Sequence, residues 1–186
     1  MGEPVINPAT YEDLKKVPAN RVAEILGGRL ITHPRPAPKH AVASSSVGSK
    51  IAPPFHHGDG GPGGWWILDE PELHLGDHVL VPDLAGWRRE NMPKIPETAW
   101  FETPPDWICE VISPSTARYD RLEKRDIYAT FKVPYLWFIE PDNRTLEAFE
   151  LQNEKWTLIA TRANDDEIAI DPFAEVPFLL GALWPD

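Results

Sequence analysis

The chain has 186 residues with 18 basic and 29 acidic side chains, so its formal net charge is −11 at pH 7. This length suits one domain with a sizeable core over residues 1–186, and the acidic balance excludes a protein that coats nucleic acid by bulk charge. The single cysteine permits no internal disulfide, and the lack of a signal pattern or of an apolar run near the ~20 residues of a membrane span predicts a cytoplasmic protein without membrane contact.

The N-terminal segment is expected to be mostly helical. Thr10, with Asp13 three residues later, resembles a capping box and predicts a helix through YEDLKKVPANRVAEIL, residues 11–26. We expect Pro18 to split this helix, because an interior proline removes a hydrogen bond and clashes with the preceding turn. The glycine pair that follows ends the helix, and GRLITH (28–33) predicts a short strand.

Two segments of different character come next. Residues 39–52 predict a helix of small residues suited to close packing against a sheet. Residues 53–64, which include FHHGDGGPGG, predict a mobile glycine-rich loop. This loop lacks the Gly-Lys-Ser/Thr ending of a phosphate-binding P-loop, so nucleotide binding is excluded. Its neighbouring His56 and His57 would point in opposite directions on an extended chain, so we do not expect both to bind one ion.

Apolar stretches in the rest of the chain predict the strands of a sheet. In HVLVPDLAGW, alternation places Asp83 on the same face as Val79, and DWICEVIS is apolar enough for the centre of a sheet. Ser115 or Thr116 is expected to cap a helix that runs to Phe131. The predicted strands are WWILDEPELHL, interrupted at its proline (65–75), HVLVPDLAGW (78–87), DWICEVIS (106–113), YLWFIEP (135–141) and the hairpin of TLEAFELQ and KWTLIATR (145–162).

A carboxylate interrupts two of these apolar strands. Asp83 lies within VPDLAGW, and Glu110 lies within DWICEVIS, where a charge is costly unless it is paired or bound to a cation. A hard cation such as Mg²⁺ prefers oxygen ligands, and these two carboxylates with the backbone carbonyl of Val111 would supply them. Lys124, on the following helix, would stabilise charge on a phosphate, and Tyr128, one turn later, would position a phosphate oxygen. The pattern therefore predicts a metal and phosphate site.

The same residues resemble a known family. VPDLAGW, CEVISPST, DRLEKRDIYA and VPYLWFIEP are similar, in order and context, to the Uma2 family, a restriction-endonuclease-like group of the PD-(D/E)xK nuclease superfamily. The segment RVAEILGGRLI, followed by His40 at a helix start, is similar to the family's N-terminal segment. The resemblance covers residues 20–151 and implies an α/β fold with a central mixed β-sheet flanked by helices and an active site at one sheet edge.

This resemblance also implies roles for the matching residues. Asp83 matches the PD acid, and Glu110 matches the acid of the next strand. The superfamily's usual lysine, two residues after that acid, is Ile112 here, which departs from the superfamily pattern. The basic role moves to the following helix, where Lys124 matches. Glu24 matches an acid of the family's first helix.

By this resemblance, the chain is expected to be a Mg²⁺-dependent endonuclease that hydrolyses DNA. Mn²⁺ is expected to substitute for Mg²⁺, and a homodimer is expected by analogy with other nucleases of this fold. The predicted catalytic residues are Asp83, Glu110, Lys124, Glu24 and Tyr128, and the predicted metal ligands are Asp83, Glu110 and Val111. The predicted substrate-binding residues are His40, Arg88, Arg89, Arg121 and Arg125.

Three alternatives stay open from the residues alone. In the first, Lys124 pairs only with Asp120, four residues earlier, on a solvated helix face. In the second, the chain is a non-catalytic binding or scaffold module that kept the fold, which the acidic composition and Ile112 favour. The third is a two-carboxylate glycosidase, which would need a cleft lined by aromatic residues and no metal.

Overall fold

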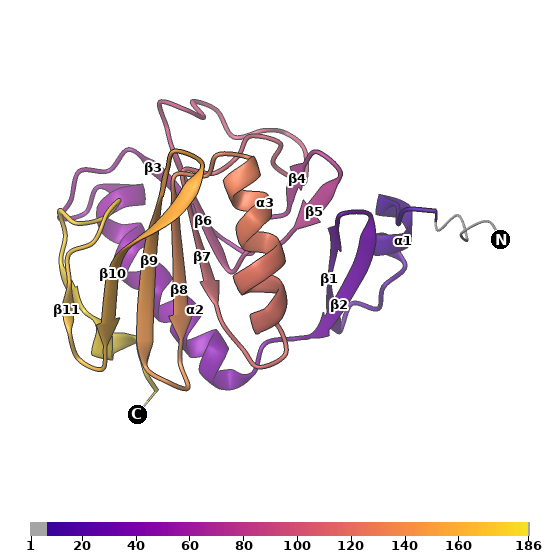
Figure 1. Cartoon of the computed structure of the whole chain (residues 1–186). Helices are drawn as coiled ribbons and strands as arrows, with labels where there is room; N and C mark the ends of the chain where they lie inside the picture. Colours follow the sequence, from indigo (N-terminus) through magenta and orange to yellow (C-terminus); the bar gives the residue numbers. More distant parts are fainter. Residues whose placement is uncertain (1–6, 186) are drawn as a thin grey trace.

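The computed structural model describes residues 7–185, which form two main β-sheets with helices packed around them (Figure 1). Six strands make a mixed sheet in the order β10-β9-β8-β7-β6-β3, and four make an antiparallel sheet in the order β2-β1-β5-β4. The strands are β1 (Arg21–Leu26), β2 (Arg29–Pro34), β3 (Trp65–Asp69), β4 (Leu73–Leu75), β5 (His78–Leu80), β6 (Leu84–Arg88), β7 (Trp107–Val111), β8 (Tyr135–Glu140), β9 (Thr145–Gln152), β10 (Lys155–Ala163), β11 (Glu167–Ile168) and β12 (Phe178–Leu179). The helical segments are α1 (Tyr11–Lys15), α2 (Pro38–Ile51), the π-helical η1 (Ala52–His57) and η2 (Tyr119–Lys124), α3 (Arg125–Thr130) and the 3₁₀-helical η3 (Leu180–Leu183).

Strand β7 lies at the centre of the six-stranded sheet because its sequence, WICEV, is buried along its whole length. It pairs antiparallel with β6 and parallel with β8. A parallel pair needs a crossover connection, and η2 with α3 provides it. The mixed sheet flanked by helices is therefore confirmed, as is the strand predicted over residues 106–113.

Side chains alternate between two hydrophobic layers along β7. Trp107 and Val111 belong to the layer that α2 covers, whereas Ile108 belongs to the layer that holds Tyr128 of α3. Figure 1 shows the two helices on opposite faces, with α3 in front of the sheet and α2 behind it. The alternation places Glu110 on the α3 side of the sheet.

The predicted N-terminal helix is confirmed only in its first turn. Thr10 and Asp13 form the expected capping box, and α1 begins at Tyr11 but ends at Lys15. Pro18 follows closely, and proline disfavours helical backbone at the residue before it. The second half of the predicted helix is strand β1.

Two glycines explain why β1 is a strand. Gly27 and Gly28 have φ of 55° and 74°, which is the left-handed backbone that a two-residue hairpin turn requires. The turn folds β2 back on β1 in the register that pairs Leu26 with Arg29. The expectation that Glu24 lies on a helix is therefore wrong, because this carboxylate projects from a strand.

The stretch HVLVPDLAGW forms two elements rather than one strand. Its first residues form β5 and its last residues form β6, and these strands belong to different sheets. Pro82 and Asp83 lie in the break, because proline has no N–H to donate to a ladder. Asp83 therefore immediately precedes β6. Because it lies outside a strand, the alternation of side chains along a strand does not fix the direction of its side chain.

The remaining predicted elements are present with shifted ends. The helix predicted over residues 39–52 is α2, and the start of the predicted glycine-rich loop is η1, while the mobility of residues 53–64 stays a prediction. The predicted hairpin is β9 and β10, and its turn residues Asn153 and Glu154 have φ of 50° and 63°. Among the described helices, none is long and apolar enough to cross a membrane.

Tight packing around β6 leads to a prediction about stability. A Cβ atom on Gly86 would lie 3.0 Å from Cδ1 of Ile67 and 3.3 Å from the ring of Trp107. We expect Gly86→Val to lower the free energy of unfolding by about 1–3 kcal/mol, because the core cannot yield without strain. Urea unfolding measures the loss, and Thr157→Val, at an exposed position of β10, is expected to stay within ~0.5 kcal/mol. Equal stability of both variants would contradict this packing.

Candidate active site

A buried lysine forms the centre of the candidate site. The Nζ atom of Lys124 lies 2.8 Å from Oε1 of Glu110, 3.0 Å from Oε1 of Glu24 and 3.5 Å from Oδ1 of Asp120. These carboxylates come from β7, from β1 and from η2, so one ammonium group joins both sheets to the crossover helix. The pair between Lys124 and Asp120 exists, but it is buried in this cluster instead of lying on a solvated face.

Burial and charge oppose each other in this cluster. Burial alone would lower the pKa of Lys124, but the carboxylates of Glu110 and Glu24 outweigh it and hold this pKa well above its usual value. Burial also raises the pKa values of Glu110 and Asp120, an effect that the lysine opposes. Lys124 is therefore an ammonium group at neutral pH, and its charge is what makes three buried carboxylates tolerable.

Tyr128 completes the cluster from α3. Its hydroxyl donates a hydrogen bond of 2.5 Å to Oε1 of Glu110, and its side chain is completely buried. Burial and the charge of Glu110 raise the pKa of Tyr128, so the hydroxyl keeps its proton. The structure therefore places Tyr128 where it orients Glu110.

Asp83, in the break before β6, is held against the end of β7, the strand that carries Glu110. Its Oδ2 atom accepts a hydrogen bond of 2.7 Å from the backbone N–H of Val111. Its Oδ1 atom lies 3.2 Å from Nε2 of His40, in the first turn of α2. The side chain of Asp83 is thus held from two sides, although it belongs to no strand.

Two imidazole rings carry nitrogen atoms without a hydrogen-bond partner. Burial would lower the pKa of His40, but its contacts with Asp83 and with the backbone of Val111 raise it overall, while Nδ1 has no partner. Burial lowers the pKa of His33, and neither of its ring nitrogens forms a hydrogen bond. Nε2 of His33 lies 3.4 Å from Oε2 of Glu24, a buried oxygen that also lacks a hydrogen bond. Buried polar atoms are usually satisfied, so these atoms mark the wall of a site.

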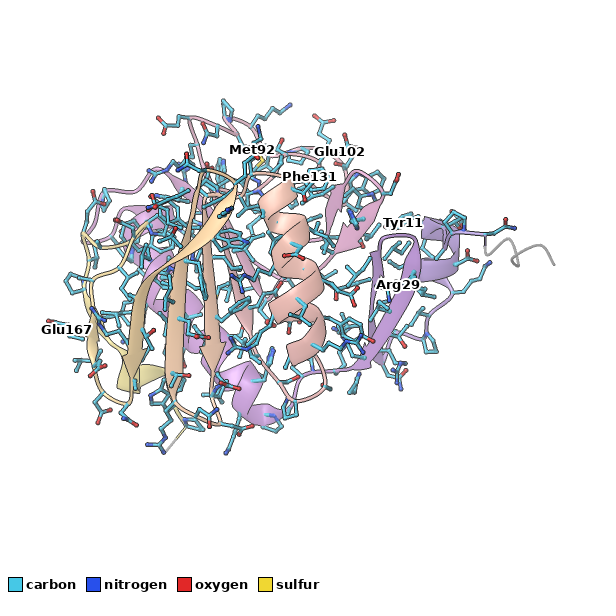
Figure 2. All side chains as sticks on the ribbon, viewed as in Figure 1. Tyr11, Arg29, Met92, Glu102, Phe131 and Glu167 are labelled. Atoms are coloured by element: carbon cyan, nitrogen blue, oxygen red, sulfur yellow. The ribbon has the colours of Figure 1, made fainter. Side chains whose placement is uncertain are left out.

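A cavity of about 260 Å³ brings three of the five predicted catalytic residues together, while Glu24 and Tyr128 do not line it. Asp83, Glu110 and Lys124 line it, with His33 and His40 on its wall. The structure therefore places the two predicted acids and the predicted amine at one cavity. Figure 2 shows side chains filling the space between α3 and the β1–β2 hairpin. The ion pair of Lys124 with Glu24 joins η2 to β1.

Two of the arginines predicted to bind substrate lie at the opposite end of β6 from Asp83. The guanidinium of Arg88 lies 4.5 Å from the ring centre of Trp65, and that of Arg89 lies 4.0 Å from the ring centre of Trp66. Arg89 also donates to two backbone carbonyls. The structure does not bring either arginine to the cavity, and their role toward substrate stays a prediction.

The other two predicted arginines lie on the crossover helix but face the sheet. Arg121 donates a hydrogen bond of 2.6 Å to Oε2 of Glu147 and lies 3.6 Å from Oε2 of Glu140. The guanidinium of Arg125 lies 5.1 Å from the ring centre of Phe149. Neither lines the cavity, because their side chains cover β8 and β9.

Sequence reasoning did not select His33 as a site residue. The signal that identifies it is the glycine pair, because the hairpin turn sets the register of β1 against β2. In that register Val22 pairs with His33 and Glu24 pairs with Ile31, so His33 and Glu24 are diagonal neighbours on one side of the hairpin. When β1 is predicted as part of a helix, the closeness of His33 and Glu24 cannot be inferred.

The oxygen atoms at the cavity suit a hard divalent cation. Asp83 and Glu110 offer carboxylate oxygens, and the carbonyl of Val111 lies at the same strand end. Within residues 7–185, no three His, Cys, Asp or Glu side chains are arranged to hold a metal. Asp83 and Glu110 supply two carboxylates, and Mg²⁺ commonly takes one or two carboxylates while it keeps several waters.

Comparisons with known proteins identify a family and a shared fold. The model of the Uma2 family, described as "Putative restriction endonuclease", matches residues 8–179. A solved structure from Anabaena variabilis ATCC 29413, described as a "putative nuclease belonging to DUF820", covers 95% of this chain and 97% of its own, with 22% sequence identity and a TM-score of 0.70. This second likeness shows that the fold is shared. No curated protein matches the chain.

The buried cluster predicts a large effect of removing the lysine. Lys124→Met leaves Glu24, Glu110 and Asp120 without their cation, so we expect the free energy of unfolding to fall by about 3–5 kcal/mol near neutral pH. The carboxylates then take up protons in the folded state, and stability falls further as pH rises, so the deficit should be larger at about pH 8 than at about pH 5. Urea unfolding at both pH values measures it. Lys50→Met, exposed on α2, is the control, and equal losses in both variants would contradict the cluster.

Proposed function

The chain belongs to the Uma2 family, and from this premise we propose that it is a Mg²⁺-dependent endonuclease that hydrolyses phosphodiester bonds in DNA. The observation that carries the proposal is the cavity in which Asp83, Glu110 and Lys124 meet. Two carboxylates and an ammonium group at one recess match the needs of a metal-assisted attack on a phosphate. The family is described as a restriction endonuclease and the structural neighbour as a nuclease, which supports the same function.

Asp83, Glu110 and the carbonyl of Val111 would hold the cation. When bound, Mg²⁺ supplies charge neutralisation at the scissile phosphate and a more acidic water, and Mn²⁺ is expected to replace it. The protein contributes the fixed positions of these oxygens. The N–H of Val111 orients Asp83, and the hydroxyl of Tyr128 orients Glu110.

Lys124 has two tasks in this proposal. Its contacts with Glu110 and Glu24 hold these carboxylates in place. Its charge, at the wall of the cavity, would also stabilise negative charge that develops on a phosphate. Glu24 acts through Lys124 and through the backbone N–H of Val81, to which its Oε1 atom is hydrogen-bonded at 2.8 Å.

His40 is the group we assign to the substrate phosphate. Its Nε2 atom contacts Asp83, which leaves Nδ1 without a partner at the cavity wall. In the imidazolium form of His40 both ring nitrogens carry protons, so a phosphate oxygen would accept a hydrogen bond from Nδ1. Since His40 contacts Asp83 as well, the ring would align the phosphate with the carboxylate that holds the cation.

One observation favours a second candidate, a binding or scaffold module of the same fold. Oε1 of Glu110 already accepts from Lys124 and from Tyr128, and Ile112 occupies the position of the superfamily's usual lysine. A chain in which these contacts are permanent would bind nucleic acid without cutting it.

A homodimer is also part of the proposal, by analogy with nucleases of this fold, and sedimentation velocity tests it.

The proposal predicts the loss of metal-dependent cleavage in two variants. Asp83→Asn and Glu110→Gln each remove one charged oxygen ligand, so we expect the rate of nicking of supercoiled plasmid DNA to fall at least ~100-fold. Glu97→Gln, at a side chain that is 90% exposed, should cut like the wild type. A chelator should stop cleavage, and Mg²⁺ or Mn²⁺ should restore it.

Undiminished cleavage in both ligand variants would reject the assignment of the site. A wild-type protein that binds DNA but never cuts it with either metal would instead select the scaffold module. Circular dichroism spectra of each variant separate a lost ligand from a lost fold.

A further inference from the structure

Two neighbouring cavities meet at Asp83. The first is the catalytic cavity of about 260 Å³, and the second measures about 230 Å³ and extends toward α2 and the end of β3. They share four lining residues, which are Pro36, His40, Glu70 and Asp83. The two cavities are therefore parts of one groove that passes Asp83 on both sides.

We propose that this groove binds one extended nucleic-acid strand, with the scissile phosphate at Asp83 and the adjoining nucleotide placing an amino-bearing base in the second cavity. This inference rests on the proposed function and adds the path of the strand and a base preference.

A buried nitrogen atom between the cavities indicates that the groove takes a ligand. The side chain of His40 is 10% exposed, it lines both cavities, and its Nδ1 atom has no hydrogen-bond partner. Leaving such an atom unsatisfied costs free energy that a bound acceptor recovers. A phosphate oxygen at Asp83 is the acceptor that this position offers.

Hydroxyl groups line the groove on both sides of that phosphate. Ser115 and Thr116, at the start of the crossover helix, line the first cavity, and Ser44 and Ser45 of α2 line the second. Neutral hydroxyls contact a polyanion without demanding a compensating charge. Their presence on both sides of Asp83 fits a strand that continues past the scissile bond.

Two exposed cations lie near the start of α2: Arg35, which lines the first cavity, precedes the helix, and Lys39 lies in its first turn, next to His40. Arg35 lies 3.7 Å from Glu70, and Lys39 lies 3.4 Å from Asp142. Their side chains are 55% and 61% exposed. Exposed pairs of this kind contribute little stability, so these cations can exchange their partners for strand phosphates.

The acids of the second cavity select what occupies it. Asp69 and Glu70 line this cavity together with the serines, and a phosphate would be repelled there. A carboxylate accepts hydrogen bonds from the exocyclic amino group of cytosine, which thymine lacks. The base of the adjoining nucleotide, rather than its phosphate, therefore fits the second cavity.

Blocking the second cavity tests the strand path. The probe is a fluorescein-labelled phosphorothioate oligodeoxycytidylate about ten nucleotides long, a length within the usual site sizes for single strands. Fluorescence anisotropy with Mg²⁺ measures its Kd. Ser45→Trp should weaken binding about tenfold or more, because the indole fills the cavity, while Ser49→Trp, exposed on the same helix outside the groove, should leave the Kd unchanged.

Base selection is tested with the same assay. Wild-type protein should bind the cytidylate probe about tenfold more tightly than the matching thymidylate probe, and Asp69→Asn should reduce this difference. Equal affinity for both probes, or equal effects of Ser45→Trp and Ser49→Trp, would overturn the inference.

The outcomes separate this inference from the nuclease function. If Ser45→Trp abolishes selective binding and the protein never cuts DNA, the strand path along the groove is supported and the nuclease function is rejected. Cleavage that Ser45→Trp leaves unchanged rejects the groove and retains the nuclease. Mn²⁺ calorimetry on Ser45→Trp should match the wild type, because Asp83 and Glu110 are untouched, and a lost metal site would count against the assignment of this serine to the strand path.

Discussion

The ion pairs of Lys124 are the constraint on which the rest of the structure depends. A single ammonium group, 2% exposed in the folded chain, satisfies carboxylates from β1, β7 and η2. The desolvation of these four groups is costly, and only their mutual contacts make the arrangement stable. Removing any member leaves the others in an apolar surrounding, so the two sheets and the crossover helix keep one relative placement near the cavity.

That placement explains why a break in a strand carries the first acid. Pro82 ends the pairing that β5 began, and the N–H of the preceding residue, Val81, is held by Glu24. Asp83 then reaches across the strand end to the N–H of Val111. The segment around Asp83 is therefore fixed by the same carboxylate that Lys124 holds, which links the proposed metal ligands to the buried lysine. The π-helical η2 belongs to this link, and π-helical turns are frequent at functional sites.

The sequence was most informative where a charge interrupts an apolar run. Asp83 and Glu110 were predicted as a pair for that reason, and the strand of Glu110 and the helix of Lys124 lie where the pattern placed them. Glu24 was predicted on a helix because the capping box at Thr10 indicated a helix and the glycine pair was expected to end it, whereas these glycines form the hairpin turn between β1 and β2. Local patterns specify elements, but the contact of β1 with a distant helix is set by tertiary packing.

The predicted substrate-binding arginines show that the sequence alone does not specify the contacts of a charged side chain. Arg88, Arg89, Arg121 and Arg125 were expected to face substrate because their charge suits phosphate, yet each packs on an aromatic ring, and Arg121 also pairs with two glutamates. A sequence specifies the charge of an arginine, but it does not specify which groups that arginine contacts.

The central claim, that Asp83 and Glu110 share one cation beside Lys124, is tested most directly by a crystal soaked in Mn²⁺. We expect anomalous density between these two carboxylates, with the ammonium group of Lys124 still beside Glu110. A manganese ion bound only elsewhere, or carboxylates that point away from each other, would contradict the claim.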